Sequence, residues 1–170
     1  IVVLVVGALA LNTYVIKPKA VEASNENAKA VAYFMQGDWE KALNGDDAEC
    51  IGFQAVADEY KCYQAGKLAA LYTGVCYYQM GQFEDAAAYL DKFSADDLTI
   101  EPAALQLLGD AYVQMEDFAK AVKAFEAAAK SGNELIAPMS LKKAGLVYLE
   151  LGDKAAAKKA FETIKTDYPA

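Results

Sequence analysis

Several residue types that build reactive or cross-linked sites are scarce in this sequence. Its 170 residues include no histidine, three cysteines and four prolines. Without histidine the common zinc spacings cannot form, and Cys50, Cys62 and Cys76 contain no CxxC pair, so we expect no metal and no cofactor. An odd cysteine count also argues against a disulfide framework, and we expect Cys76 on a buried helix face. Few β-branched residues follow Ile16, while Ala, Leu, Glu, Lys and Gln are abundant, which predicts an all-α fold.

Positive charge is also in deficit. The chain has 16 Lys and Arg against 24 Asp and Glu, for a net charge of −8. A surface that follows phosphates needs excess basic residues, so no nucleic-acid partner is expected. The sequence also lacks a nucleophile motif and a phosphate-binding loop. The remaining candidates for catalysis are two adjacent carboxylate pairs, Asp46 with Asp47 and Asp96 with Asp97, and such pairs on loops are usually solvated caps. We therefore expect no enzyme activity and no small-molecule substrate.

The first eleven residues, Ile1 to Leu11, form an uninterrupted apolar run that fades before Lys17, Pro18 and Lys19. A spanning helix needs about 20 apolar residues. Because the chain opens on Ile1 without an initiator methionine, we expect the segment to begin upstream and interpret residues 1–19 as the end of a transmembrane anchor. Two alternatives stay open: a signal peptide, for which "ALA" at residues 8–10 resembles a cleavage site, and a buried core helix.

An internal repeat occupies most of the remaining chain. Gly74, Gly109 and Gly145 are spaced by 35 and 36 residues. The residues that follow each glycine at fixed distances are a tyrosine (Tyr77, Tyr112, Tyr148), an alanine (Ala86, Ala121, Ala157) and a large apolar residue (Leu90, Phe125, Phe161). Small residues let paired helices approach closely, and the aromatic residues fill the space between successive units. Pro102 and Pro138 suit the first turn of a helix.

This period and residue pattern resembles the tetratricopeptide repeat. The resemblance implies a solenoid of helix pairs with three clear units over residues 67–170. A degenerate unit over residues 20–66 precedes them, because "YFMQGDWEKAL" at 33–43 matches a turn and second helix, with Trp39 in the place of Phe83 and Phe118. That unit is about ten residues too long, so we expect an inserted loop near "NGDDAE" at 44–49. A turn that caps a helix starting near Ile51 is favoured there over a calcium loop, whose ligand spacing is absent.

The anchor, the "YF..G.WE.ALNGD" segment and the three repeats together resemble bacterial membrane-anchored tetratricopeptide proteins similar to the ancillary subunit of the Sec translocon. This resemblance implies a single-pass protein of the bacterial inner membrane, with its repeats on the periplasmic side. It also implies a scaffold or adaptor that binds a protein in or near the membrane.

The first helices of tetratricopeptide units line a groove, and the resemblance places twelve residues of this chain there. The residues in the groove positions that we expect to bind a partner are Leu68, Leu71, Val75 and Tyr78, then Ala103, Gln106, Asp110 and Val113, then Met139, Lys142, Leu146 and Leu149. The Lys and Asn clamp of chaperone-binding relatives is absent, since Leu71, Val75, Asp110 and Leu146 stand in its place. An apolar groove of this kind suits apolar protein segments.

Two alternatives concern what covers the apolar faces. The groove could be filled by the helix expected at 20–36 or by a second copy of the chain. The expected final helix, 155–167, leaves Phe161 and Ile164 without cover, which favours self-association through this helix or a further segment of chain.

Overall fold

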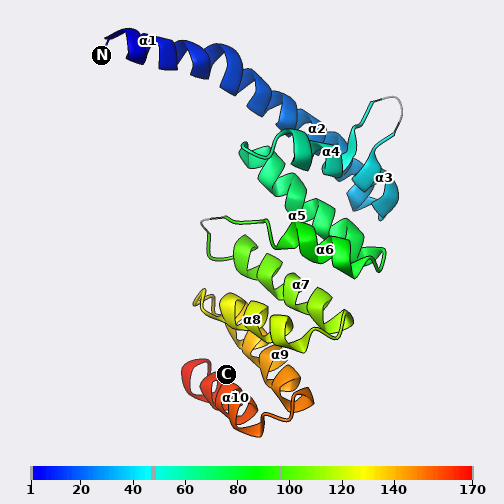
Figure 1. Ribbon diagram of the computed structural model, residues 1–170, viewed down its shortest axis with the longest axis vertical. Coiled ribbons are helices and arrows are strands. Elements are labelled where there is room, and N and C mark those ends of the chain that lie inside the picture. Colours follow the sequence, from blue (N-terminus) through cyan, green and yellow to red (C-terminus); the bar gives the residue numbers. More distant parts are fainter. Residues whose placement is uncertain (1, 47–48, 96, 170) are drawn as a thin grey trace. The chain divides into compact units, whose positions relative to one another are not determined.

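The computed structural model describes residues 2–46, 49–95 and 97–169, with the backbone alone at positions 2, 3 and 8. Ile1, Asp47 and Asp96 therefore lie outside the described residues. Within these ranges the regular elements are helices, apart from one isolated bridge between Asp46 and Cys50. The expected all-α fold is confirmed (Figure 1).

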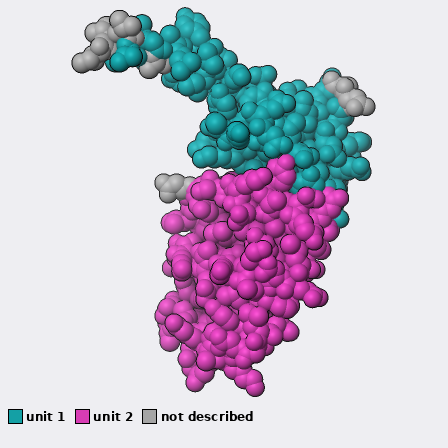
Figure 2. Space-filling model, in the orientation of Figure 1, with its two compact units in different colours: residues 1–80 teal, residues 81–170 magenta. Residues whose placement is uncertain are grey.

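The chain forms two compact units, which Figure 2 shows in different colours. Unit 1 comprises residues 1–80 and unit 2 residues 81–170. The following paragraphs describe each unit by itself.

Unit 1 begins with one continuous helical segment. Helix α1 (Val2–Leu11) passes into a π-helical stretch (Asn12–Ile16) and then into α2 (Lys17–Met35). The N–H of Lys17 donates to the carbonyl of Asn12, five residues earlier. Pro18 follows and has no N–H to donate, so the hydrogen-bond pattern shifts at this point without ending the helix. No break separates the expected anchor from the first repeat unit.

An aromatic cluster holds the rest of unit 1 together. Helices α3 (Trp39–Asn44), α4 (Gly52–Glu59) and α5 (Gln64–Gln79) pack with α2. Phe34 of α2 lies edge-on to Trp39, Phe53 and Tyr72, with ring centroids 5.0–6.0 Å apart. The rings of Phe53 and Tyr72 stack at 4.7 Å. Phe53 is completely buried, so the four rings form the centre of this unit.

The insertion in the first unit differs from the expected loop. A helix was predicted to begin near Ile51, and α4 begins at Gly52, but it ends at Glu59, before α5 starts at Gln64. The additional residues thus form a turn and a separate two-turn helix. Helix α4 exists because Phe53, Val56 and Ala57 bury one of its faces. The expected cap is also absent, since Ile51 precedes the helix without a side-chain bond.

Unit 2 contains α6 (Phe83–Leu90), α7 (Ile100–Gln114), α8 (Phe118–Ala129), α9 (Ile136–Glu150) and α10 (Lys154–Asp167). Figure 1 shows α7 to α10 as successive antiparallel helices joined by short turns. Pro102 and Pro138 lie in the first turns of α7 and α9, as predicted. Asp117 and Asp153 accept hydrogen bonds from the backbone N–H groups of Lys120 and Ala156, which caps α8 and α10.

A glycine and an aromatic ring determine how closely each helix pair in unit 2 can approach. A Cβ atom on Gly109 would lie 2.4 Å from the Phe125 ring, and one on Gly145 would lie 2.6 Å from the Phe161 ring. The glycines therefore make room for a ring of the second helix. Phe125 is also covered by Ala144 and Val147 of α9 and is only 1% exposed. Phe161 is 36% exposed, so its removal will destabilise the fold less than that of a fully buried ring.

The turn between α7 and α8 has Glu116 at the position where the equivalent turns of the other two clear repeats have glycine. Gly81 and Gly152 have φ values of 75° and 76°, and Glu116 occupies the same left-handed region at 57°. A side chain with a Cβ atom is strained there by about 1 kcal/mol relative to glycine. This departure from the repeat pattern is thus a real backbone feature of the second clear repeat.

Candidate protein-binding surfaces

Helix α9 presents the most exposed apolar face among the predicted groove residues. Met139, Leu146 and Leu149 are 47–50% exposed, and Lys142 between them is exposed as well. Their spacing of three and four residues places all four side chains on one helix face. Ser140, Ala144 and Val147 face the interior of the unit and are buried. Helix α9 therefore has separate packing and solvent-facing sides.

The equivalent face of α7 is more polar, and two of its residues are already bonded to α9. The amide nitrogen Nε2 of Gln106 donates to Oγ of the buried Ser140 at 3.0 Å. Both carboxylate oxygens of Asp110 accept from Nζ of Lys143, at 2.8 and 2.6 Å. These bonds hold the two groove helices together, so Gln106 and Asp110 are engaged within the fold.

Two further predicted positions on α7 have different surroundings. Val113 packs against the buried cluster around Phe125, which leaves it only partly available to a partner. Ala103 is exposed at the other end of the face. Among these positions α9 thus offers more exposed apolar surface than α7.

The sequence predicts Lys142 as a partner-binding residue of the groove and gives no role to its neighbour Lys143. The structure places Lys143 opposite Asp110 and 5.7 Å from the centre of the Phe125 ring, where its stem is partly buried. The signal that could have identified it is the carboxylate of Asp110 on an otherwise apolar face, which needs a cation from the neighbouring helix. Lys142 remains on the exposed face.

In unit 1 the predicted stripe lies on α5. Leu68 is 36% exposed, and Leu71, Val75 and Tyr78 are half-buried. Ala69, Thr73 and Cys76, on another face of the same helix, are completely buried. The stripe is therefore distinct from the face that forms the core.

Leu149 also borders a second apolar surface, at the end of unit 2. We define the end face as a shallow cleft lined by the apolar side chains of Leu149, Ala157 and Phe161 and by the lysines Lys154, Lys158 and Lys165. Glu162 completes the lining and pairs with Lys158 at 3.5 Å, in an exposed ion pair. The end face therefore combines apolar side chains with more positive than negative charge.

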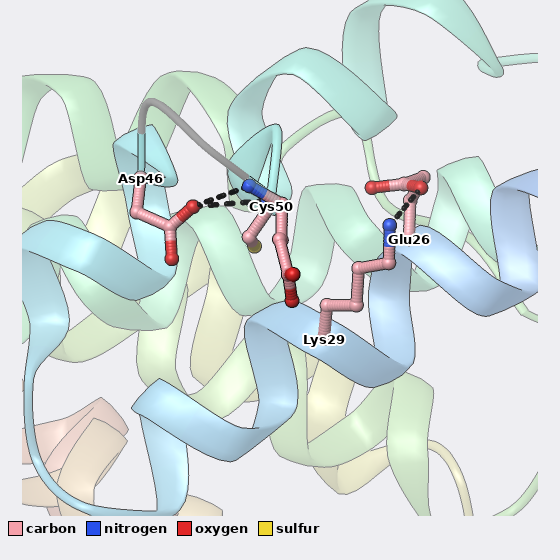
Figure 3. A network of polar contacts seen from close by, with 5 residues as sticks. Glu26, Lys29, Asp46 and Cys50 are labelled. Carbon is pink, nitrogen blue, oxygen red and sulfur yellow. Dashed lines mark hydrogen bonds and ion pairs between the residues drawn. The ribbon is translucent and has the colours of Figure 1, made fainter.

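The acidic turn of unit 1 lies beside α2, and Figure 3 shows polar contacts within each, those of Asp46 in the turn and that of Lys29 with Glu26 on the helix. A carboxylate oxygen of Asp46 accepts from the backbone N–H groups of Glu49 and Cys50, at 2.7 and 3.1 Å. The other oxygen accepts from the hydroxyl of Tyr33, and nearby Lys29 pairs with Glu26 at 2.7 Å. Asp46 thus stabilises the turn itself, as expected of a turn-forming residue.

The other carboxylate pair contains a turn residue of the same kind. Asp97 accepts from the backbone N–H groups of Thr99 and Ile100, and these bonds hold the pKa of its carboxyl below the usual range. Asp47 and Asp96, the other members of the two pairs, lie outside the described residues. The two described members of these pairs, Asp46 and Asp97, therefore both bond to the backbone of a turn.

The cysteines lie in separate environments. Cys50 and Cys76 are buried and Cys62 is exposed. Burial raises the pKa of the Cys76 thiol to about 12 and also raises that of Cys50. Among the described residues, no group of three or more Cys, Asp or Glu side chains is arranged to hold a metal ion.

The N-terminal segment Leu4–Met35 is a helix of 32 residues that is long and apolar enough to cross a membrane. None of its most apolar stretch is buried within the fold. A signal sequence passes the same test of length and composition, so this observation supports a membrane segment without identifying its type.

Comparison with protein-family models identifies the repeats. Models described as tetratricopeptide repeat match residues 68–96 and residues 107–170, together more than half of the chain. The chain is a tetratricopeptide-repeat protein. The matches name no narrower group, and a search of curated proteins finds no match. Tetratricopeptide repeats generally act as protein-interaction modules, so the exposed faces of α5 and α9 are candidate binding surfaces.

Proposed function

We propose that this tetratricopeptide-repeat protein is a membrane-anchored, non-catalytic scaffold whose groove residues hold an apolar segment of a protein partner. The observation that carries the proposal is the exposed apolar face of α9, where Met139, Leu146 and Leu149 are each about half exposed. Apolar side chains in this arrangement can bury surface against a partner at little cost in reorganisation. The half-buried stripe of Leu71, Val75 and Tyr78 on α5 is the second contact region.

The test replaces Leu146 with glutamate in the full chain and measures which proteins co-purify from solubilised membranes. The lost apolar contact and the buried charge should each weaken binding by about 2 kcal/mol, so recovery of the partner should fall more than tenfold. Leu151→Glu is the matched control, because Leu151 is 49% exposed, close to the 50% of Leu146, and lies outside the groove positions. Equal loss of partner in both variants would contradict a role for the groove.

Tyr78→Glu tests the α5 stripe in the same assay. We expect a folded variant with an unchanged circular dichroism spectrum and more than tenfold weaker partner recovery. An unfolded variant would assign Tyr78 to the core. A folded variant that retains every partner would remove α5 from the binding surface.

The location we propose is the bacterial inner membrane, with a single pass and the repeats in the periplasm. In this proposal residues 1–19 end the anchor, residues 20–66 form the degenerate first repeat and residues 67–170 the three clear repeats. An accessory role in a membrane complex such as the protein translocon follows from the resemblance of the anchor and first repeat to that group. Lys17 and Lys19 count against this topology under the positive-inside rule.

Added protease tests the topology. In spheroplasts the repeats should be digested while the membrane is intact. Digestion only after the membrane is broken would place the repeats in the cytoplasm.

Self-association through α10 is the second candidate, and the exposure of Phe161 favours it. Light scattering on the purified chain distinguishes the two. A dimer that becomes a monomer on Phe161→Ala would support self-association, whereas a monomer at all concentrations would exclude it.

A further inference from the structure

The end face has an internal counterpart in the same unit, one repeat earlier. A shift of 36 residues aligns α8 with α10 and Phe125 with Phe161. On α8 this face is covered by α9, whose Ala144, Val147 and Tyr148 pack on Phe125. Among the described residues no helix covers the same face of α10. The exposed fraction of the aromatic ring accordingly rises from 1% at Phe125 to 36% at Phe161.

The difference between the two faces is the charge around the ring. The positions that are Phe118, Val122 and Ala129 in α8 are Lys154, Lys158 and Lys165 in α10. The first two of these α8 residues pack in the cluster that α9 covers. A helix that covers α10 in the same manner therefore meets the ammonium groups of Lys154 and Lys158 where α9 meets apolar side chains, and Lys165 adds a third positive charge. Such a helix needs carboxylates at its edges.

One acceptor side chain is the same in both repeats. The hydroxyl of Tyr148 in the covering helix donates to Oε1 of Glu126 at 2.7 Å. Glu162 stands at the position of Glu126 in α10 and is exposed. It offers an acceptor to a hydroxyl or amide donor on the incoming helix.

From these observations we propose that the end face binds an amphipathic α-helix of a partner protein, one that has an apolar centre and acidic flanks. The apolar centre packs on Leu149, Ala157 and Phe161, and the acidic flanks pair with the three lysines. This surface shares Leu149 with the groove positions on α9 and contains none of the other predicted groove residues. A second copy of α10 is a poorer occupant, because it would bring three lysines against three lysines.

The test uses two synthetic peptides built on α9, the helix that covers α8. Both span residues 136–151 and keep Ala144, Val147 and Tyr148. The acidic probe has Ser140→Glu, Leu141→Glu and Leu151→Glu, and the matched control has lysine at these three positions. Each probe is labelled and titrated with the full chain in neutral detergent micelles, and binding is followed by fluorescence anisotropy.

We expect the acidic probe to bind at least about tenfold more tightly than the basic control. Raising the salt concentration should reduce this ratio, since the charges are near the surface. In the chain variant Lys154→Glu/Lys158→Glu/Lys165→Glu, the preference should reverse. All three lysines are exposed, and circular dichroism establishes that the variant is folded.

Three outcomes would overturn the proposal. Equal affinity for the two probes would show that the lysines do not select a partner, and no binding of either probe would show that the face does not accept a helix. Self-association that the probes cannot compete with would make a second copy the occupant. These outcomes leave the groove proposal intact, because that proposal is tested by the loss of partner in Leu146→Glu.

Discussion

The two units use different side chains where their paired helices pack together. In unit 2 each of the pairs α7–α8 and α9–α10 places a glycine of the first helix against a phenylalanine ring of the second, Gly109 with Phe125 and Gly145 with Phe161. In unit 1 the pair α2–α3 is joined by a cluster of four aromatic side chains from four helices, Phe34, Trp39, Phe53 and Tyr72. The repeated glycine–phenylalanine contact needs one small and one large residue at a fixed spacing. The aromatic cluster instead depends on α4, which the period of the repeat does not contain.

This difference implies different sensitivities to mutation. A change in the repeated glycine–phenylalanine contact should destabilise one helix pair, because each repeat contacts chiefly its neighbours. A change in the aromatic cluster should affect α2, α4 and α5 together, since one ring contacts several helices.

The largest effect is expected for Phe53→Ala. Removing a completely buried ring leaves a cavity among Phe34, Tyr72 and α4 and should lower the free energy of unfolding by about 3–5 kcal/mol. Hydrogen exchange should show loss of protection throughout α2, α4 and α5. Phe125→Ala is the counterpart in unit 2, and its loss should centre on α7, α8 and α9. Protection lost over the same helices in both variants would contradict the comparison.

A smaller effect is expected for Gly109→Val. Its Cβ would lie 2.4 Å from the Phe125 ring, so the ring must move, at a cost of about 1–3 kcal/mol. Combining it with Phe125→Leu should cost less than the sum of the two single changes, because the smaller side chain leaves room for the valine. Chemical denaturation of the four members of this cycle measures the coupling. Strict additivity would show that the glycine does not accommodate the ring.

Tyr148→Phe tests a polar contact of the regular repeats. Loss of the hydrogen bond to Glu126 should cost about 1 kcal/mol at neutral pH. The hydrogen bond to the Glu126 carboxylate, followed by burial, raises the pKa of Tyr148 to about 12. Since the folded pKa exceeds the unfolded value near 10, the stabilisation is complete below pH 10 and is lost as the pH rises toward 12.

The difference in stability between wild type and Tyr148→Phe should therefore shrink between these two pH values. Tyr112 and Tyr60 also have raised pKa values, so the subtraction is needed to isolate Tyr148. A difference that stays constant up to pH 12 would contradict the assignment.

The smallest effect is expected for Glu116→Gly. It relieves the strain of a positive φ at the α7–α8 turn, while the more flexible unfolded chain offsets part of the gain. We expect a net increase in unfolding free energy of less than about 1 kcal/mol, measured by denaturant titration. Gly152→Ala, at a φ of 76° in the next turn, should change stability in the opposite direction.

The period of the repeat predicts the regular part of the fold well. Each of its signals, glycine, alanine and aromatic, is local in sequence and repeats in register, so the helix starts near Pro102 and Pro138 follow directly. The N-terminal caps at Asp117 and Asp153 were not predicted, although each aspartate precedes a helical run by one residue and so carries the sequence signal of an N-cap. Helix α4 was harder to predict from the sequence, because only its burial against α2 and α5 distinguishes these eight helical residues from a loop.

The candidate surfaces were predicted only in part. The repeat pattern gives the positions that face the groove, and on α9 these are exposed. Pairing across helices depends on side-chain direction, which spacing alone does not supply, and for that reason Lys143 and Ser140 were missed as partners of Asp110 and Gln106. The charge of the end face was not predicted, because Lys154, Lys158 and Lys165 are ordinary lysines of a helix when the sequence is taken alone. Only a comparison of α10 with α8 at equivalent positions shows that they replace apolar residues.

The uninterrupted N-terminal helix has a mechanical consequence. Its 32 residues from Leu4 to Met35 are about 48 Å long, and a bilayer core takes up about 30 Å of such a helix. Its later turns, with the buried residues Ala23, Asn27 and Ala30, are at the same time part of the first repeat. If the apolar end lies in a bilayer, no hinge separates it from unit 1. Any tilt or rotation of the membrane segment would then move unit 1 with it, because the two share one continuous helix. The same helix would hold that unit at a fixed distance from the lipid surface.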